Sequence, residues 1–296
     1  MKIGITGATG LIGNAVGRLA AESGHSLIAY SRDPKRSSLP WAAETRAVDV
    51  RADQPLDLSG LDTIIHLAGE TILGFWTKAK MQRIRDTRVD LTRKIARTIT
   101  SMPQPPKALL CASGTGFYGD RGDELLDESA SAGSDYLASV CIDWEAAARE
   151  AEQVRCRVVH LRTGLVFARE GGAWPLMKKA FSLGAGGNLG DGKQWMPWIH
   201  LEDEARLILW AAEHEMIRGP VNLAAPEALR NADFTRALAK HLKRPAFMHA
   251  PRFALKLALR ELADALTASQ HATPAKALAG GFQFRHPDLK TALTAL

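Results

Sequence analysis

Three glycines spaced three residues apart constrain the start of the chain more than any other feature. Gly7, Gly10 and Gly13 follow a short apolar run, 2–6, and lead into the amphipathic stretch NAVGRLAAES. Glycine destabilises helices, so three of them where a strand gives way to a helix need a reason. In a βαβ unit they permit a tight turn, let the backbone approach a pyrophosphate at the helix N-terminus, and let helix and strand pack closely. We therefore expect a dinucleotide site at Gly7, Thr9, Gly10, Leu11, Ile12 and Gly13.

Short apolar runs alternate with amphipathic stretches through the first half of the chain. Strands that alternate with helices predict a parallel sheet covered on both faces. The runs are nearly continuous in apolar residues, as in TIIHLAG and KALLCASG, which is typical of strands buried on both sides. The strands that we expect are Lys2–Thr6, Ser26–Tyr30, Thr45–Asp49, Thr63–Leu67, Ala108–Ala112 and Arg157–Leu161. The fold class is therefore α/β, with a doubly wound parallel sheet.

The alternation of strand and helix patterns ends after Gly164. A glycine-rich stretch with two tryptophans, GAGGNLGDGKQWMPWIH, comes first, and beyond Arg230 the pattern is mostly helical. We place a second, smaller and mostly helical lobe here and expect it to bind a small-molecule substrate. The first lobe is expected to comprise residues 1–167 plus about 196–228, and the second about 168–195 plus 229–296.

Charge and cysteine content argue against several classes of protein. The formal net charge is +6 and the sequence pI is about 9.3, but Lys and Arg are scattered among acidic residues. We therefore expect no nucleic-acid partner. The three cysteines are not closely paired and have no His partners at metal-ligand spacing. This pattern predicts reduced thiols and no metal site. A strand at the very start and the lack of a long apolar segment predict no signal peptide, no membrane span and a cytoplasmic location.

The residues after the second expected strand indicate the type of dinucleotide. In HSLIAYSRDP, Ser31 stands where an NAD-selective site would carry a carboxylate for the ribose 2′-hydroxyl. Arg32 comes next, and a guanidinium there suits the additional 2′-phosphate of NADP. A shift of one residue would put Asp33 at the tip instead, and Arg32 could be an ordinary exposed arginine of a turn. We expect NADP(H) as the cofactor.

Several motifs resemble those of a known superfamily. GATGLIG, DTIIHLAGE and ASGTGFYG are similar to motifs of the extended short-chain dehydrogenase/reductases. More narrowly, YLASVCIDWEAAA, LRTGLVFAREGGA, GGNLGDGKQWMPWIHLEDEA, GPVNLAAPEALRNADF and the ending RPAFMHAPRF…GGFQFRHPDL resemble an atypical epimerase-like family. That family is related to sugar-nucleotide epimerases and carries its own C-terminal domain. The resemblance covers nearly the whole chain.

The resemblance implies a Rossmann-type first lobe, with the reaction in a cleft between the lobes. Ser113 matches the serine that hydrogen-bonds the substrate oxygen in the wider superfamily. By analogy with related proteins, we also consider a homodimer formed through a pair of helices. The implied cofactor-binding residues are Asp49 and Val50 near the adenine, Leu67, Ala68 and Gly69 beside the nicotinamide ribose, and Ser113.

The pair of residues that the superfamily uses for catalysis is missing. Its usual chemistry needs a Tyr and, four residues later, a Lys whose charge lowers the pKa of the tyrosine. Counted from Tyr136, the lysine position is Val140. Counted back from Glu145, the pair becomes Leu137 and Cys141. Neither register supplies both residues, so either other groups move the proton or the protein binds the dinucleotide without turnover.

Other polar groups of the expected cleft are the candidates for catalysis. Ser113 is expected to orient the substrate as a hydrogen-bond donor, and Glu70 follows a strand end, where ligands gather. Simpler explanations exist, since Tyr118 could pack at a turn and His200 could cap a helix. The catalytic candidates are Ser113, Glu70, Tyr118 and His200, and we also considered Thr115, Tyr136 and Cys141.

The glycine-rich loop and two arginines are candidates for ligand binding. The loop could close over a ligand and exclude water, although its tryptophans could equally pack between the lobes. Arg162 could meet an anionic group of the substrate or form a structural ion pair. Arg88, in RDTRVDLT, has the same two explanations, and we count it with the cofactor-binding residues. The substrate candidates are Arg162, Lys193, Gln194, Trp195 and Trp198.

Two hypotheses on function remain open. The first is an NADP(H)-dependent oxidoreductase or epimerase that acts on a small polar carbonyl- or sugar-like substrate. The second is an NADP(H)-binding protein without turnover that senses redox state or holds a partner. The missing lysine favours the second hypothesis, whereas Ser113 and the loop around Trp195 favour the first.

Overall fold

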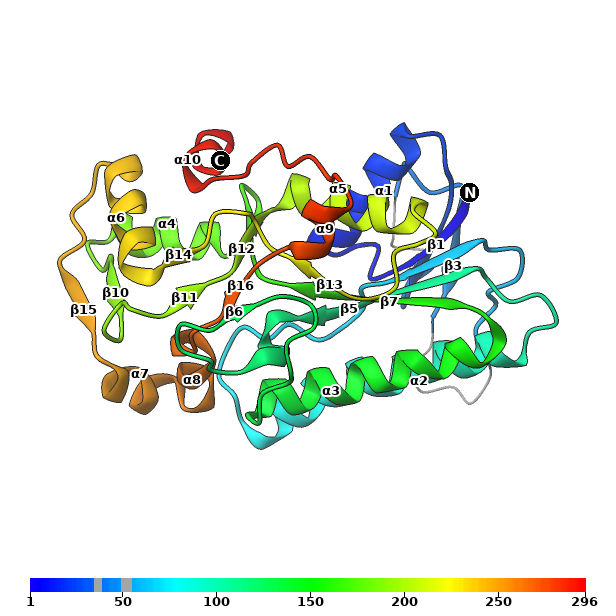
Figure 1. The fold of residues 1–296 in the computed structure, drawn as a ribbon, viewed down its shortest axis with the longest axis horizontal. Helices are drawn as coiled ribbons and strands as arrows, with labels where there is room; N and C mark the ends of the chain where they lie inside the picture. Colours follow the sequence, from blue (N-terminus) through cyan, green and yellow to red (C-terminus); the bar gives the residue numbers. More distant parts are fainter. Residues whose placement is uncertain (35–38, 49–54) are drawn as a thin grey trace.

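A seven-stranded parallel sheet forms the centre of the molecule (Figure 1). The computed structural model describes residues 1–34, 39–48 and 55–296. The strand order is β13-β7-β5-β4-β1-β2-β3, and every neighbouring pair is parallel. The strands are β1 (Lys2–Thr6), β2 (Ser26–Ser31), β3 (Glu44–Ala47), β4 (Thr63–His66), β5 (Ala108–Gly114), β7 (Arg157–Thr163) and β13 (Gly219–Leu223). The parallel α/β sheet predicted from the sequence is confirmed.

Helices cover both faces of this sheet (Figure 1). One face carries α1 (Leu11–Glu22) and α5 (Leu201–Glu213), and the other carries α2 (Lys78–Ser101) and α3 (Tyr136–Arg149). Each layer of helices closes its own hydrophobic core. Ile64 and Ile65 are consecutive in β4 and enter different cores, because successive side chains of a strand point to opposite faces. The sheet is therefore doubly wound.

A smaller, mostly helical lobe lies beyond one end of the sheet, on the left in Figure 1. Its core includes Trp174, Phe181, Phe234 and Leu238. Its elements are α4 (Trp174–Ser182), β10 (Gly187–Leu189), β11 (Trp195–Met196), β14 (Leu229–Arg230), α6 (Asn231–Leu242), β15 (Met248–Ala250), α7 (Arg252–Leu259), α8 (Glu261–Thr267) and α10 (Leu289–Ala295). A small sheet of β8 (Leu165–Ala168), β9 (Gly171–Gly172) and β12 (Trp198–His200) leads from the central sheet to this lobe.

The sequence pattern predicts that all of residues 229–296 lie in the second lobe. Part of this C-terminal segment instead packs against the first lobe. Strand β16 (His271–Ala272) pairs with β6 (Leu125–Leu126), and α9 (Ala275–Ala279) packs against β13. Ala277 and Phe282 are buried in the core of the first lobe, which explains why the segment crosses back before α10. The remaining lobe boundaries stay predictions. Two short 3-10 helices, at Thr115–Tyr118 and Glu150–Val154, complete the described elements.

A buried histidine, His66, links the carboxyl ends of β1 and β4 to α2. His66 in β4 bonds through Nδ1 to the hydroxyl of Thr6, at 2.6 Å, and through Nε2 to the hydroxyl of Thr92, at 2.9 Å. Thr92 donates its proton to the carbonyl of Arg88, so it accepts from Nε2, and Nδ1 accepts from Thr6. Burial lowers the pKa of His66 to about 3, which keeps the ring neutral. The histidine thus fixes the ends of β1 and β4 relative to α2.

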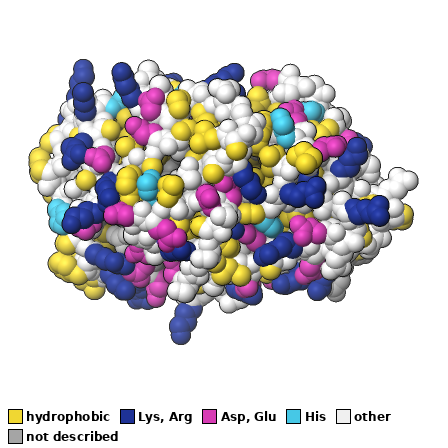
Figure 2. Space-filling model, viewed as in Figure 1, with side chains coloured by type: hydrophobic (Ala, Val, Ile, Leu, Met, Phe, Trp, Pro, Cys, Tyr) yellow, Lys and Arg dark blue, Asp and Glu magenta, His cyan; other side chains and the backbone are white. Residues whose placement is uncertain are grey.

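The surface carries charges of both signs. On the face shown in Figure 2, Lys and Arg are interspersed with Asp and Glu. None of the helices in the described part of the chain is both long and apolar enough to cross a bilayer.

Candidate cofactor and substrate site

The turn between β1 and α1 is packed so closely that two of its positions require glycine. Gly7 has a φ of +70°, and a Cβ there would lie 2.8 Å from the backbone N of Ala68. A Cβ at Gly13 would lie 2.3 Å from the carbonyl O of Gly7. Gly10 begins α1 without a side-chain cap, and the first helical turn carries no acidic residue. The backbone N–H groups of this turn can therefore bind an anion such as a diphosphate.

The strand order places this turn at the point where the sheet changes direction. The chain runs from β1 outward to β2 and β3, then returns to β4 on the other side of β1 and continues through β5 and β7. Ligands of open α/β sheets bind at the carboxyl ends of the strands at such a point. The structure brings three of the predicted groups to this edge, namely the glycine turn, Leu67–Gly69 after β4, and Ser113 in β5.

The end of β2 carries the residues expected to select the dinucleotide. Ser31 is the last residue of β2, and Arg32, which follows it, is exposed. The backbone N–H of Asp33 donates to Ser31 Oγ, at 3.2 Å. Asp49 and Val50, which we expect near the adenine, lie outside the described residues.

Glu70 is held in an ion pair that sequence reasoning missed. Its Oε1 lies 2.6 Å from Lys80 Nζ in the first turn of α2. The hydrogen bond from Lys80 lowers the pKa of Glu70, and the charges of Lys80, Arg83 and Arg32 add to this effect. A carboxylate that stays ionised is a poor proton donor near neutral pH. The structure therefore argues against Glu70 as a catalytic acid.

Ser113 donates its proton to a buried carboxylate. Ser113 Oγ lies 2.8 Å from Glu145 Oε1, and Arg162 holds the same carboxylate through Nε at 2.8 Å and Nη2 at 3.0 Å. Burial raises the pKa of Glu145, but the hydrogen bonds and charge of Arg162 outweigh it, so the net shift is downward. Ser113 consequently presents lone pairs, and not a proton, to a ligand. This corrects the expectation that Ser113 acts as a hydrogen-bond donor.

Arg162 and Tyr118 are part of the same buried network and do not reach a ligand. Arg162 is 3% exposed, and its Nη1 donates to Tyr118 Oη at 3.0 Å. Tyr118 is fully buried and bonds to Asn222 Oδ1 at 2.7 Å. Burial raises the pKa of Tyr118. Arg162 thus forms the structural ion pair that was its alternative explanation, and the catalytic expectation for Tyr118 is wrong because its hydroxyl is enclosed.

Helix α3 turns different side chains toward the strand ends and away from them. Cys141 Sγ lies 3.8 Å from the carbonyl O of Gly114, and Leu137 packs against Gly116. Tyr136 turns away, and its hydroxyl donates to the carbonyl of Met81 at 2.6 Å. Leu137 and Cys141, the pair counted back from Glu145, therefore lie against the segment at the end of β5, and Tyr136 does not. Burial raises the pKa of Cys141 to about 11, so neither position offers an acid or base near neutral pH.

The loop residues of the second lobe are mostly engaged with protein groups. Trp195 stacks on His271 with ring centroids 4.0 Å apart, and its indole N–H donates to Asp123 Oδ1 at 2.9 Å. Arg230 lies over the indole and also bonds to Asp123. This cluster joins the two lobes. Trp195 is half-buried, so its contact with a substrate stays a prediction.

Three other substrate candidates of this loop differ in exposure. Lys193 is exposed, and nothing in its position conflicts with the prediction. Gln194 is buried and donates to the carbonyl of Leu189 at 2.9 Å. Trp198 is 1% exposed, lies in the core of the second lobe and donates to the carbonyl of Glu227 at 3.0 Å. Gln194 and Trp198 therefore stabilise the lobe, contrary to the expected ligand contacts.

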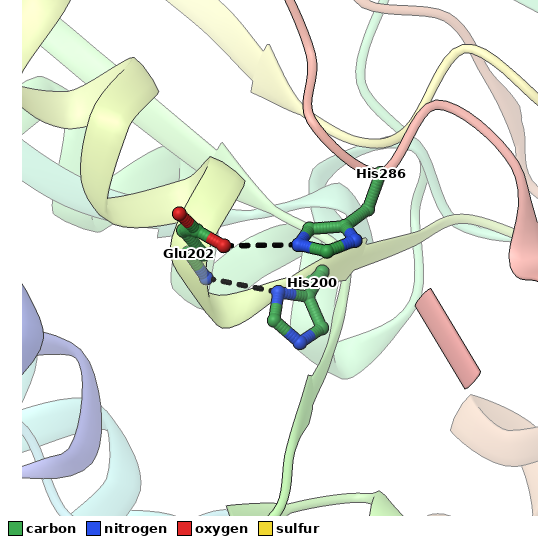
Figure 3. A group of neighbouring side chains, drawn as sticks. All are labelled: His200, Glu202 and His286. Carbon is green, nitrogen blue, oxygen red and sulfur yellow. Dashed lines mark hydrogen bonds and ion pairs between the residues drawn. The ribbon is translucent and has the colours of Figure 1, made fainter. Parts of the chain in front are cut away.

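His200 belongs to a cluster that fastens the C-terminal segment to α5 (Figure 3). Its Nδ1 accepts a hydrogen bond from the backbone N–H of Glu202 at 3.2 Å, and the centroids of the His200 and His286 rings are 4.0 Å apart. His286 Nε2 bonds to Glu202 Oε2 at 3.0 Å, and Arg285 pairs with the other oxygen. One ligand atom from each of His200, Glu202 and His286 lies within 4.8 Å of the others, and these are residue types that bind metals. Both oxygens of Glu202 are paired, whereas His286 Nδ1 is buried without a hydrogen-bond partner among the described residues.

The role of His200 is therefore that of a cap, which was its simpler explanation. Burial lowers the pKa of His200 to about 4, with a smaller contribution from His286. The ring is neutral at pH 7 and accepts a hydrogen bond at the start of α5. This position does not support His200 as a proton donor.

A glycine turn at the switch point of a doubly wound parallel sheet defines a dinucleotide-binding protein of the Rossmann type. Comparison with known families narrows this class. The profile of the NAD dependent epimerase/dehydratase family matches residues 3–224, and that of a domain of unknown function, DUF1731, matches residues 250–296. The chain therefore belongs to the NAD dependent epimerase/dehydratase family, and its resemblance to the atypical epimerase-like proteins is confirmed.

Similar proteins match over nearly their whole length. The chain is 34% identical to the epimerase family protein YfhF of Bacillus subtilis, over 100% of this chain and 98% of the relative. It is 34% identical to the epimerase family protein SDR39U1 of Mus musculus, over 99% and 98%. The crystal structure of human SDR39U1 (isoform 2) with NADPH has a TM-score of 0.89 at 32% identity, over 99% of this chain and 98% of that chain. UDP-glucuronic acid 4-epimerase from Bacillus cereus, at 16% identity and a TM-score of 0.76, shares the fold alone.

Proposed function

We propose that the chain binds NADP(H) along the carboxyl edge of the central sheet. The observation that carries this proposal is the turn at Gly7 and Gly13, where any Cβ would collide with backbone atoms. The first N–H groups of α1 would hold the diphosphate. Exposed Arg32 would hold the 2′-phosphate of the adenosine. The NADPH in the human SDR39U1 crystal structure supports NADP(H) over NAD(H).

The proposed chemistry is that of an oxidoreductase or epimerase with a small polar carbonyl- or sugar-like substrate. A bound nicotinamide supplies or accepts a hydride, so the chain must move the matching proton. Ser113 lies at the correct end of β5 and already donates to Glu145. A substrate hydroxyl would give its proton to Ser113 Oγ while Ser113 passes its own proton to the Glu145 carboxylate, which is ionised and can accept it. Ser113 and Glu145 would thus replace the missing Tyr and Lys.

A screen of aldehydes, ketones and nucleotide sugars, followed by NADPH absorbance, tests this proposal. With a substrate in hand, Ser113→Ala and Glu145→Gln should each lower kcat by about 10²–10⁴-fold, because proton transfer is lost. The exposed Glu261→Gln is the matched control and should leave kcat unchanged. NADPH affinity, measured by calorimetry, should change far less than kcat in both variants. Turnover by Ser113→Ala at the rate of the unmodified protein would refute the relay.

A second candidate function is NADP(H) binding without turnover. The observation that favours it is that Leu137 and Cys141, which lie against the end of β5, offer no acid or base there. Tight NADPH binding without turnover of any substrate class in the screen would support this candidate. The cytoplasmic location and the homodimer stay predictions.

A further inference from the structure

Arg88 places a cation directly behind the end of β4. Its guanidinium Cζ lies 3.3 Å from the position that a Cβ on Gly69 would take, so the side chain of Arg88 packs directly against Gly69. Its Nη1 donates to the carbonyls of Glu70, at 2.8 Å, and Ile84, at 3.1 Å. The guanidinium also lies 5.1 Å from the ring centroid of Trp144. These neutral partners fix the position of the charge without neutralising it.

The acidic residues around this position are paired with other cations. Glu70 pairs with Lys80 at 2.6 Å, and Glu145 pairs with Arg162 at 2.8 Å. Among the described residues, no ion pair includes Arg88. A guanidinium keeps its proton at neutral pH, so a net positive charge remains at this edge.

The field of Arg88 extends across the strand ends to α3. Burial raises the pKa of both Tyr136 and Cys141, and the charge of Arg88 acts in the opposite direction on each. Cys141 lies against Gly114 at the end of β5. Because Arg88 packs against Gly69 after β4 and its neighbour Cys141 lies against the end of β5, the guanidinium adjoins the space over these two strand ends. In the proposed function, this space belongs to the nicotinamide, because the diphosphate lies at the β1 turn and the adenosine lies toward β2.

We infer that Arg88 makes the protein bind NADPH more tightly than NADP⁺. The inference rests on the proposed cofactor site and concerns the form of the coenzyme that the site selects. The oxidised nicotinamide ring carries a positive charge and the reduced ring carries none, whereas the phosphates are the same in both. A fixed cation in a half-buried site repels only the oxidised ring. The selectivity would suit either a reductase or a protein that reports the reduced coenzyme.

Calorimetric titration with NADPH and with NADP⁺ tests the inference without any substrate. The unmodified protein should bind NADPH at least about tenfold more tightly than NADP⁺, because like charges at short range in a partly buried site repel by at least the ~1.4 kcal/mol to which a tenfold ratio corresponds. In Arg88→Met the ratio of the two dissociation constants should fall below about threefold. Arg88→Lys keeps the charge and should keep most of the selectivity. Arg93→Met, which removes a cation from the exposed side of the same helix, is the matched control and should keep the full ratio.

The outcomes separate this inference from the assignment of the cofactor. Equal affinities for NADPH and NADP⁺ in the unmodified protein would overturn the role of Arg88 and leave the cofactor site standing. An undiminished ratio in Arg88→Met, with a folded circular dichroism spectrum, would overturn it as well. If Arg88→Met does not fold, Arg88→Gln removes the charge while retaining a donor for the Glu70 carbonyl. No heat with either coenzyme would overturn the cofactor site and, with it, this inference.

Discussion

Arg162→Met should lower the free energy of unfolding by about 3–5 kcal/mol, because it leaves the carboxylate of Glu145 buried without its cation. Both side chains of the pair are only 4% exposed, and Arg162 supplies two of the hydrogen bonds to that carboxylate. Ser113 would be the remaining partner of Glu145. The loss should be measured by urea unfolding at pH 7, followed by circular dichroism.

Two further variants show whether the effect comes from the buried charge. Replacing both partners, in Arg162→Met with Glu145→Leu, should recover much of the lost stability, because no unpaired charge then remains inside the protein. The exposed pair of Arg236 and Asp233 provides the control, and Arg236→Met should cost less than about 1 kcal/mol. A loss below about 1 kcal/mol for Arg162→Met would show that water reaches the Glu145 carboxylate.

The difference in free energy of unfolding between Glu204→Gln and the unmodified protein should grow by about 3–5 kcal/mol as the pH rises. Glu204 is fully buried in the first turn of α5, and its Oε1 accepts a hydrogen bond from Thr163 Oγ1 at 3.0 Å. Its Oε2 is buried and finds no hydrogen-bond partner among the described residues. Burial raises the pKa of Glu204 from 4.5 to about 8. Each unit of such a shift corresponds to about 1.4 kcal/mol, which sets the size of the expected effect.

The sign of the effect follows from the direction of the shift. The folded pKa lies above the unfolded one, so Glu204 weakens folding progressively as the pH rises from about 4.5 to about 8. Glutamine does not titrate, so Glu204→Gln should gain stability relative to the unmodified protein between pH 5 and pH 8.5. Urea unfolding at both pH values measures the difference. Parallel pH profiles for the two proteins would mean that burial does not raise the pKa of Glu204.

The sequence was sufficient to predict the sheet and the glycine turn, because both depend on local patterns. Apolar runs bounded by glycine or polar residues define strands, and Gly13 is required by a backbone contact with Gly7 in the same short stretch. Of the two registers considered for α3, the one counted back from Glu145 contains the side chains that lie against the end of β5, since a helix places residues four apart on one face. These inferences needed no knowledge of distant contacts.

The roles of the polar side chains could not be predicted in the same way. Arg162 pairs with a glutamate of α3, and Tyr118 bonds to Asn222, 104 residues further along the chain. Which buried polar groups meet across such separations depends on the packing of helices onto the sheet. Lys80 gave no sign of its ion pair with Glu70, because a lysine at the start of a helix is ordinarily solvated. The candidate site was therefore predicted at the level of strand ends, and its hydrogen bonds were not.

The central claim is that the β1–α1 turn and Arg32 bind the phosphates of NADP(H). Calorimetric titration of the unmodified protein and of Arg32→Ser with NADPH and NADH tests it most directly. We predict that the unmodified protein binds NADPH more tightly than NADH, and that Arg32→Ser weakens NADPH binding by about 10–100-fold while hardly changing NADH binding. Binding of NADH as tight as that of NADPH, or no heat with either coenzyme, would contradict the claim.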